Sequence, residues 1–140
     1  MKEDLKFLLL NKFHFIEAIS IEEAEKFGIS EKNMILSSRV ATLIANNELS
    51  ISEIAKLLGV SRQAVHQVVK EFESKNCFIT KNSDENKKIK IVYLTEEGKE
   101  LFENRKKIMK KVEERVASKI GKEKLKLLKE ILNEDWNEKL

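Results

Sequence analysis

Apolar residues recur every three or four positions over most of the chain, a spacing typical of helices that bury one face. No proline and only four glycines interrupt these stretches, which supports a mainly helical fold. Residue types that favour helix ends set the approximate limits. The predicted helices cover residues 2–19, 30–46, 50–58, 61–76, 95–121 and 122–137, with a short further segment at 21–27.

One stretch alternates between apolar and polar residues with the period of two that favours strands. It contains two extended runs, Cys77–Lys81 and Ile89–Leu94, which are separated by the polar, turn-forming residues 82–87. The pattern therefore predicts one β-hairpin in a chain that is otherwise helical. The fold class that we expect is mainly α with a small β-hairpin.

The first and last predicted helices carry more apolar residues than one buried face requires. The last helix is expected to bury Leu125, Leu128, Leu132 and Trp136. A helix that is apolar on two sides needs two bodies to cover it, and the simplest second body is another copy of the chain. The residues that form the second apolar side are Phe7, Leu10, Phe15, Leu127 and Ile131.

Residues 50–70 combine the signals for two short helices joined by a tight turn. Ser50 and Glu53 form a capping box, in which each side chain bonds the backbone amide of the other residue. Gly59 is free to adopt the positive φ that a tight turn needs, and Ser61 is placed to cap the second helix. This arrangement predicts a helix-turn-helix. The inward stripe of its second helix comprises Val65, Val68, Val69 and Phe72.

The opposite face of the second helix carries side chains suited to nucleic acid. In a helix-turn-helix this helix enters the major groove of DNA with its N-terminus first. Arginine pairs with guanine and glutamine with adenine there, each for about 1–3 kcal/mol of discrimination, whereas lysine meets phosphate. The same face is also compatible with an ordinary solvated helix surface. The candidate DNA-contacting residues of this helix are Ser61, Arg62, Gln63, His66, Gln67 and Lys70.

The positive charge of the chain is concentrated around this motif. The whole sequence has 27 Lys and Arg against 24 Asp and Glu, a net charge of +3, and residues 50–95 hold eight cations against five anions. This segment therefore accounts for the entire excess, as expected of a module that binds a polyanion. The hairpin lysines that we expect to meet phosphates are Lys81, Lys87, Lys88 and Lys90.

Residues 54–65, together with Leu94, Thr95 and Gly98 after the hairpin, resemble a MarR-type winged helix-turn-helix regulator. The resemblance extends over essentially the whole chain and implies a single domain, residues 1–140. It also implies a homodimer that binds double-stranded DNA at a pseudo-palindromic site and controls transcription, often as a repressor that a small ligand or an oxidant relieves. The resemblance assigns residues 1–29 and 96–140 to dimerisation helices and residues 30–95 to the winged helix-turn-helix lobe.

The sequence departs from the family pattern at two places in the hairpin. Family members commonly carry an Asp-Arg pair at the tip, whereas this chain has Asn86, Lys87 and Lys88 there. Lysine lacks the planar fork of arginine, so we expect the tip to make electrostatic contacts with little sequence dependence. The glycine that usually precedes the hairpin is replaced by Asn76, which tolerates the left-handed conformation.

Several function classes are disfavoured. The chain has no Gly-rich phosphate loop and no nucleophile triad, so we expect neither enzymatic activity nor a cofactor. His14, His66 and Cys77 lack the spacing of a zinc site, so we expect no bound metal. The apolar run 7–10 follows acidic residues and is too short to span a membrane, which favours a cytoplasmic protein. The cations within 105–111 interleave with glutamates and are expected to be solvated.

The effector site, the role of the single cysteine and the class of partner each allow alternatives. The resemblance implies an effector pocket between the dimerisation helices and the DNA-binding lobe, and Phe13, His14 and Arg39 are candidates to line it, although ordinary packing explains them equally well. Cys77 fits a buried thiol better than a redox sensor, yet an oxidant-sensing regulator remains an alternative. A winged helix that binds protein partners or RNA is a further alternative.

Overall fold

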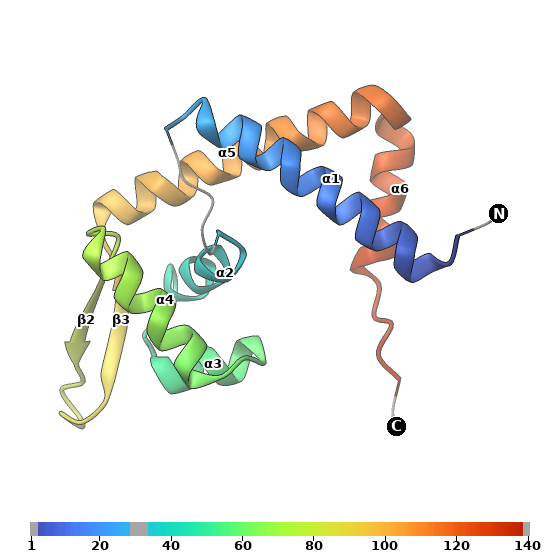
Figure 1. Cartoon of the computed structure of the whole chain (residues 1–140). Helices are drawn as coiled ribbons and strands as arrows, with labels where there is room; N and C mark the ends of the chain where they lie inside the picture. Colours follow the sequence, from blue (N-terminus) through green and yellow to red (C-terminus); the bar gives the residue numbers. More distant parts are fainter. Residues whose placement is uncertain (1–2, 29–33, 139–140) are drawn as a thin grey trace. The chain divides into compact units, whose positions relative to one another are not determined.

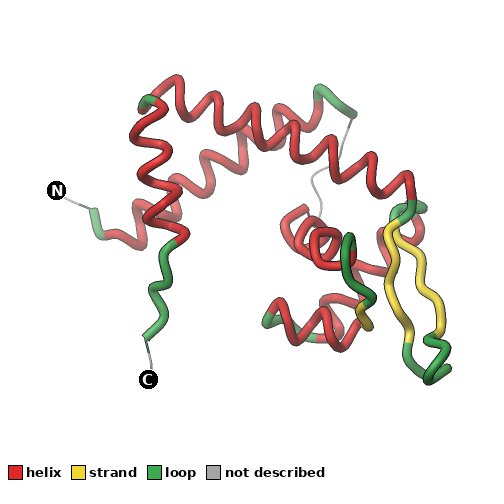
Figure 2. Tube along the Cα trace, turned by 180° about the vertical axis from the view of Figure 1, so that it is seen from behind, coloured by secondary structure: helices red, strands yellow, loops and turns green. Residues whose placement is uncertain are grey.

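The computed structural model describes residues 3–28 and 34–138, and these residues form a mainly helical chain with one small antiparallel sheet (Figure 1, Figure 2). The predicted fold class is therefore confirmed, although the cap proposed at residue 30 lies outside the described residues. The elements in chain order are α1 (Leu5–Glu25), α2 (Met34–Ile44), β1 (Leu49–Ser50), α3 (Ile51–Leu58), α4 (Arg62–Ser74), β2 (Phe78–Asn82), β3 (Lys90–Leu94), α5 (Glu96–Ile120) and α6 (Lys122–Asn133).

The chain divides into two compact units. The helical unit consists of residues 1–29 and 107–140 and contains α1, the second part of α5, and α6. The winged unit consists of residues 30–106 and contains the elements from α2 to β3 together with the first part of α5. The winged unit carries the helix-turn-helix and the hairpin that the sequence predicts.

The winged unit is held together by a core of apolar side chains from every one of its helices. Three aromatic rings lie at its centre, because Phe72 of α4 packs against Phe78 of β2 and Phe102 of α5 with ring centroids 5.6 and 6.0 Å apart. The predicted inward stripe of α4 is confirmed, since each of its residues is at most 3% exposed. Burial of this stripe leaves the opposite face of α4 to solvent.

The local signals read from residues 50–70 are confirmed. The Ser50 hydroxyl accepts a hydrogen bond from the Glu53 amide at 3.2 Å, and the Glu53 carboxylate accepts one from the Ser50 amide at 3.1 Å. Gly59 ends α3 with a φ of 67°, and the Ser61 hydroxyl caps α4 by accepting from the Ala64 amide at 3.0 Å. These short-range bonds set where each helix of the motif begins and ends.

The hairpin forms as predicted, with one addition. β2 and β3 pair antiparallel from Phe78 opposite Leu94 to Asn82 opposite Lys90, and both strands start one residue later than expected. The sheet also contains β1, which the sequence analysis missed and which pairs with β3 on the side away from β2. A strand of two residues is too short to show an alternating pattern.

The Leu-Thr-x-x-Gly sequence after the hairpin joins the hairpin to α5. The Thr95 hydroxyl lies 2.6 Å from the Asn76 carbonyl oxygen and 3.1 Å from that of Cys77, and it accepts from the Gly98 amide at 2.9 Å. A side chain at position 98 would place its Cβ 2.2 Å from the Cys77 carbonyl oxygen. Asn76 has a φ of 60°, the left-handed conformation expected there. The motif therefore fixes the direction in which the hairpin leaves α4 and α5 begins.

Arg105 corrects the expectation that all cations within 105–111 are solvated. This side chain is only 3% exposed, and its guanidinium donates to the Ser37 hydroxyl at 2.6 Å. Its carbon Cζ also lies 5.0 Å from the centre of the Phe102 ring. Arg105 follows Phe102 and precedes Ile108 by three residues each, so it sits on the buried stripe of α5. The count of charges did not show that Arg105 is buried, whereas its spacing from Phe102 and Ile108 does.

In the helical unit, α1 is one continuous helix, so the predicted end at residue 19 and the separate segment at 21–27 are wrong. No glycine or proline interrupts this stretch, and the Ser20 hydroxyl bonds back to the Ile16 carbonyl oxygen at 2.8 Å without ending the helix. Ile19 and Ala24 pack with Ile108 and Val112 of α5 across this region. Continuous burial therefore favours continuing the helix.

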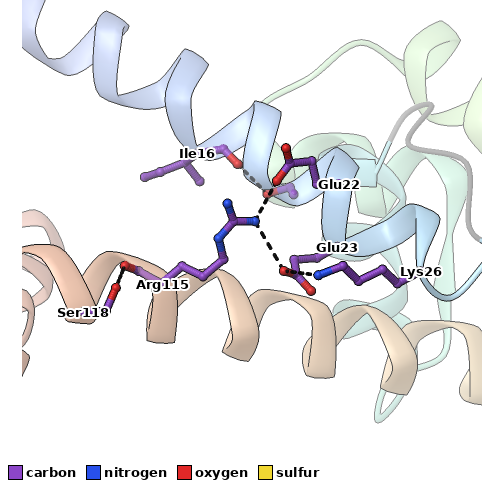
Figure 3. A network of polar contacts seen from close by, with 7 residues as sticks. Ile16, Glu22, Glu23, Lys26, Arg115 and Ser118 are labelled. Carbon is purple, nitrogen blue, oxygen red and sulfur yellow. Dashed lines mark hydrogen bonds and ion pairs between the residues drawn. The ribbon is translucent and has the colours of Figure 1, made fainter.

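Figure 3 shows that a polar network also joins α1 to α5. Arg115 donates to Glu22 at 2.8 Å and to Glu23 at 3.3 Å, and Lys26 bonds Glu23 at 3.1 Å. Glu23 is only 4% exposed. The hydrogen bond from Lys26 holds the pKa of the Glu23 carboxyl below its ordinary value, which keeps this buried group ionised.

The last helix differs from the prediction in length and burial. α6 ends at Asn133 rather than near residue 137, and none of its residues is buried. Leu128, Leu132 and Trp136, which we expected to be covered, are 40, 50 and 53% exposed. The apolar residues of the first half of α1 are exposed as well. A single chain does not cover these surfaces, which agrees with their surplus of apolar residues.

Replacing Gly98 by alanine is expected to destabilise the protein, although alanine in a helix is normally more stable than glycine by about 0.5–1 kcal/mol. The new Cβ would clash with the Cys77 carbonyl, so the join between hairpin and α5 must shift. We expect the free energy of unfolding in urea to fall by about 1–3 kcal/mol. Lys99→Ala, at the next and exposed position, serves as the control and should change it by less than about 0.5 kcal/mol. A Gly98→Ala protein at least as stable as the wild type would contradict this role.

Candidate nucleic-acid interface

The outer face of α4 is the first component of the candidate site. Every predicted DNA-contacting residue of this helix is exposed, in contrast to the buried stripe on its opposite face. The row begins at the N-terminal cap and continues for the first two turns and beyond. The residues in this row are Ser61, Arg62, Gln63, His66, Gln67 and Lys70.

A cleft of about 340 Å³ joins part of this row to the hairpin. It brings Arg62 and His66 of α4 together with Lys88 and Lys90 at the hairpin, residues that are more than twenty positions apart in the sequence. Four of the predicted site residues therefore line one cleft. Its remaining lining residues are Ser50, Ile51, Ser52 and Ile89.

The first turn of α3 is a part of this cleft that the sequence analysis did not include. Ser52 lines it together with the capping residue Ser50. The capping box marked this turn as a helix N-terminus, where unpaired amides and the helix dipole favour an anion. The capping box therefore marked the first turn of α3 in the sequence, but the closeness of this turn to α4 and the hairpin depends on tertiary packing.

The other predicted contacts lie outside the cleft. Gln63, Gln67 and Lys70 stay on the exposed face of α4, and Lys87 lies in the loop between β2 and β3. Lys81 belongs to β2, where its Nζ atom lies 5.6 Å from the centre of the Tyr93 ring. The structure thus divides the predicted residues into a cleft group and a group spread over the surface of the winged unit.

The electrostatics of the cleft favour a negatively charged ligand. Its lining contains Arg62, Lys88 and Lys90 and no carboxylate. Among the residues that the structure describes, the ion pairs within 4 Å involve none of these three cations. Their charge is consequently available to an external anion.

The candidate effector residues lie on two different elements. Phe13 and His14 are exposed neighbours on α1 with ring centroids 6.1 Å apart, and Arg39 is exposed on α2. The first two belong to the helical unit and the third to the winged unit. Their role as effector ligands therefore remains a prediction.

In the described parts of the chain, residues 3–28 and 34–138, no group of three or more His, Cys, Asp or Glu side chains is arranged to hold a metal ion. None of the helices there has the length and apolar character needed to cross a membrane.

Comparison with known proteins agrees with the resemblance seen in the sequence. The MarR family is matched by residues 35–87, which include the helix-turn-helix, β2 and most of the loop that follows β2, but not β3. The uncharacterized HTH-type transcriptional regulator YdgJ of Bacillus subtilis is 28% identical over 105 residues. That alignment covers 75% of this chain and 62% of YdgJ, so the chain spans less than two thirds of this relative.

Solved structures share the fold over nearly the whole chain. The transcriptional repressor CouR, bound to a 23-mer DNA duplex, superposes with a TM-score of 0.78 at 19% identity, over 92% of this chain and 89% of CouR. BpsR of Bordetella bronchiseptica, whose DNA binding is regulated by 6-hydroxynicotinic acid, gives a TM-score of 0.69 at 14% identity, over 95% of this chain and 96% of BpsR. These likenesses confirm the winged helix fold.

Cys77 occupies the junction between α4 and β2. It is 6% exposed, and its thiol lies 3.5 Å from the Lys75 carbonyl oxygen. Burial raises the pKa of this thiol above its ordinary value, and the nearby Glu97 carboxylate acts in the same direction. A raised pKa leaves less of the reactive thiolate at neutral pH, which favours the expectation of an inert cysteine.

We therefore expect native Cys77 to react slowly with a thiol reagent. At pH 7.5, 5,5′-dithiobis(2-nitrobenzoate) should modify the native chain more slowly than the chain unfolded in urea, because thiolate is the attacking species. The native rate should keep rising at pH values where an ordinary thiol has already become fully ionised. A native thiol that reacts as fast as the unfolded one would contradict this expectation and would support the oxidant-sensing alternative.

Proposed function

We propose that this chain, which resembles winged helix-turn-helix regulators of the MarR type, binds double-stranded DNA as a homodimer and controls transcription. The observation that carries the proposal is the cleft in which α4 and the hairpin present cations without a carboxylate. A duplex backbone is the abundant polyanion that such a surface fits. The related family consists of regulators rather than enzymes, and the proposal includes no catalytic step.

In the proposed complex, α4 enters the major groove with its N-terminus first. The outer row of α4, from Ser61 to Lys70, then faces bases and backbone, and Gln63 and Gln67 have the amide groups that pair with adenine. The hairpin lies beside the groove, where Lys81, Lys87, Lys88 and Lys90 contact phosphates. Phosphate contacts supply most of the affinity, and base contacts supply the choice of sequence.

A homodimer explains the exposed apolar surface of the helical unit. Monomeric soluble proteins rarely expose large apolar patches, and most large apolar side chains of the first half of α1 and of α6 are exposed. Two copies related by a twofold axis would bury both surfaces against each other and place two recognition helices about 34–36 Å apart on successive major grooves. The DNA site is then a pseudo-palindrome. The exposed apolar residues include Leu5, Phe7, Leu8, Leu9, Leu10, Leu127, Leu128, Ile131, Leu132 and Trp136.

We further propose that the protein is a cytoplasmic repressor whose DNA binding a small molecule modulates. The repressor CouR and the ligand-regulated BpsR share its fold, which supports this form of control. Phe13, His14 and Arg39 are the proposed effector contacts.

The proposal predicts specific, strongly salt-dependent binding to duplex DNA. Fragments selected from genomic DNA are labelled, and binding is measured by fluorescence anisotropy at several salt concentrations. The logarithm of the association constant should fall by about 0.9 per phosphate contact for each tenfold rise in salt. The solution mass should be twice the 16.3 kDa of the chain.

Scrambled duplex and structured RNA are the controls for this experiment. A preference for RNA, or no binding to any nucleic acid, would contradict the proposal and favour the RNA-binding or protein-binding alternative. An affinity insensitive to salt would contradict the phosphate contacts, and a strictly monomeric mass would contradict the homodimer.

A further inference from the structure

The cleft between α4 and the hairpin receives donors from a third element. The capping box of α3 uses the amides of Ser50 and Glu53, at 3.1 and 3.2 Å from their acceptors. The amides of Ile51 and Ser52, at the start of the same helix, have no intrahelical acceptor, and both residues line the cleft. The cations of α4 and the hairpin therefore face the positive end of a helix dipole across one cleft.

The acidic residue in the first turn of α3 is not part of the cleft. Glu53 lies in the first turn of α3, but its carboxylate is held by the Ser50 amide and the residue is not part of the lining. The lining residues that can bond an anion are all hydrogen-bond donors or hydroxyls. Small size, negative charge and several acceptor oxygens are thus the properties of the group that fits, and phosphate has all three.

We infer that this cleft binds one phosphate of the DNA backbone, and that Arg62 and His66 contact this phosphate rather than the edges of bases. The inference rests on the proposed function and changes the expectation that Arg62 reads guanine. It places one phosphate contact at the meeting point of α3, α4 and the hairpin. The hairpin and the recognition helix then fix the register of the protein on the duplex together.

The chemistry of the neighbouring residues separates phosphate contacts from base contacts. Lys88 and Lys90 are point charges without the planar fork that pairs with a base, and Arg62 shares the cleft with them. Gln63 and Gln67 lie outside the cleft and one helical turn apart on the exposed face of α4. Base discrimination therefore falls to the two glutamines, which favour adenine.

The test couples single side chains to single phosphates. A duplex that the wild type binds is prepared in versions in which one phosphate at a time is replaced by an uncharged methylphosphonate. Affinity is measured by anisotropy for the wild type, Arg62→Ala, Lys88→Ala and the control Lys70→Ala. Lys70 is an exposed cation of α4 outside the cleft, so it is matched in charge and helix but not in position.

We expect one phosphate in each half-site whose replacement by methylphosphonate weakens DNA binding by the wild type. The same replacement should weaken binding by Arg62→Ala and by Lys88→Ala less, by at least about twofold. Lys70→Ala should keep the full sensitivity at that phosphate. Arg62→Ala should also weaken binding to specific and scrambled duplexes by similar factors and lower the salt slope by about one. Arg62→Lys should restore much of the affinity, because a phosphate accepts a point charge.

Two results would overturn the inference. One is that every methylphosphonate weakens DNA binding by Arg62→Ala as much as it weakens binding by the wild type, so that the two losses add at every phosphate. The other is an Arg62→Ala protein, unrescued by Arg62→Lys, that loses the specific duplex and keeps the scrambled one, which would identify Arg62 as a base reader. Failure of the wild type to bind any duplex would instead refute the proposed function, so the two failures are distinguishable.

Discussion

The packing of Phe72 against Phe78 and Phe102 is the interaction on which the winged unit depends. These rings come from α4, β2 and α5, so one cluster fixes the recognition helix, the hairpin and the following helix relative to one another. Arg105 lies over two of the rings and ties them to α2 through Ser37. Because the cluster buries the inner face of α4, the polar outer face is left for a partner.

The functional surface follows from that constraint together with the junction at Thr95. The bonds of Thr95 and the close approach at Gly98 determine where the hairpin ends and α5 begins. The hairpin is thereby held where Lys88 and Lys90 share a cleft with Arg62. Cations far apart in sequence therefore line one cleft, although no single stretch of sequence contains all of them.

The sequence predicted what local bonds and burial decide, and missed what tertiary contacts decide. The capping box, the turn at Gly59 and the inner stripe of α4 depend on residues within a few positions of each other, and all were confirmed. β1 is a strand because it pairs with β3, and its two residues are too few to show an alternating apolar and polar pattern. Arg105 was classed by its charge although its helical position is buried, and the cleft required the folded hairpin. The capping box marked the N-terminus of α3 in the sequence, but only the folded structure shows that this N-terminus lines the cleft.

The central claim is that α4 and the hairpin act as one DNA-binding surface, supported from behind by the aromatic cluster. The most direct measurement is a titration of the ¹⁵N-labelled protein with a specific duplex, followed by the amide signals in NMR spectra. The account predicts that signals of residues 61–67 and 87–90 shift together at the same DNA concentrations, along with those of Ile51 and Ser52. Shifts confined to α4, or to the helical unit, would contradict it.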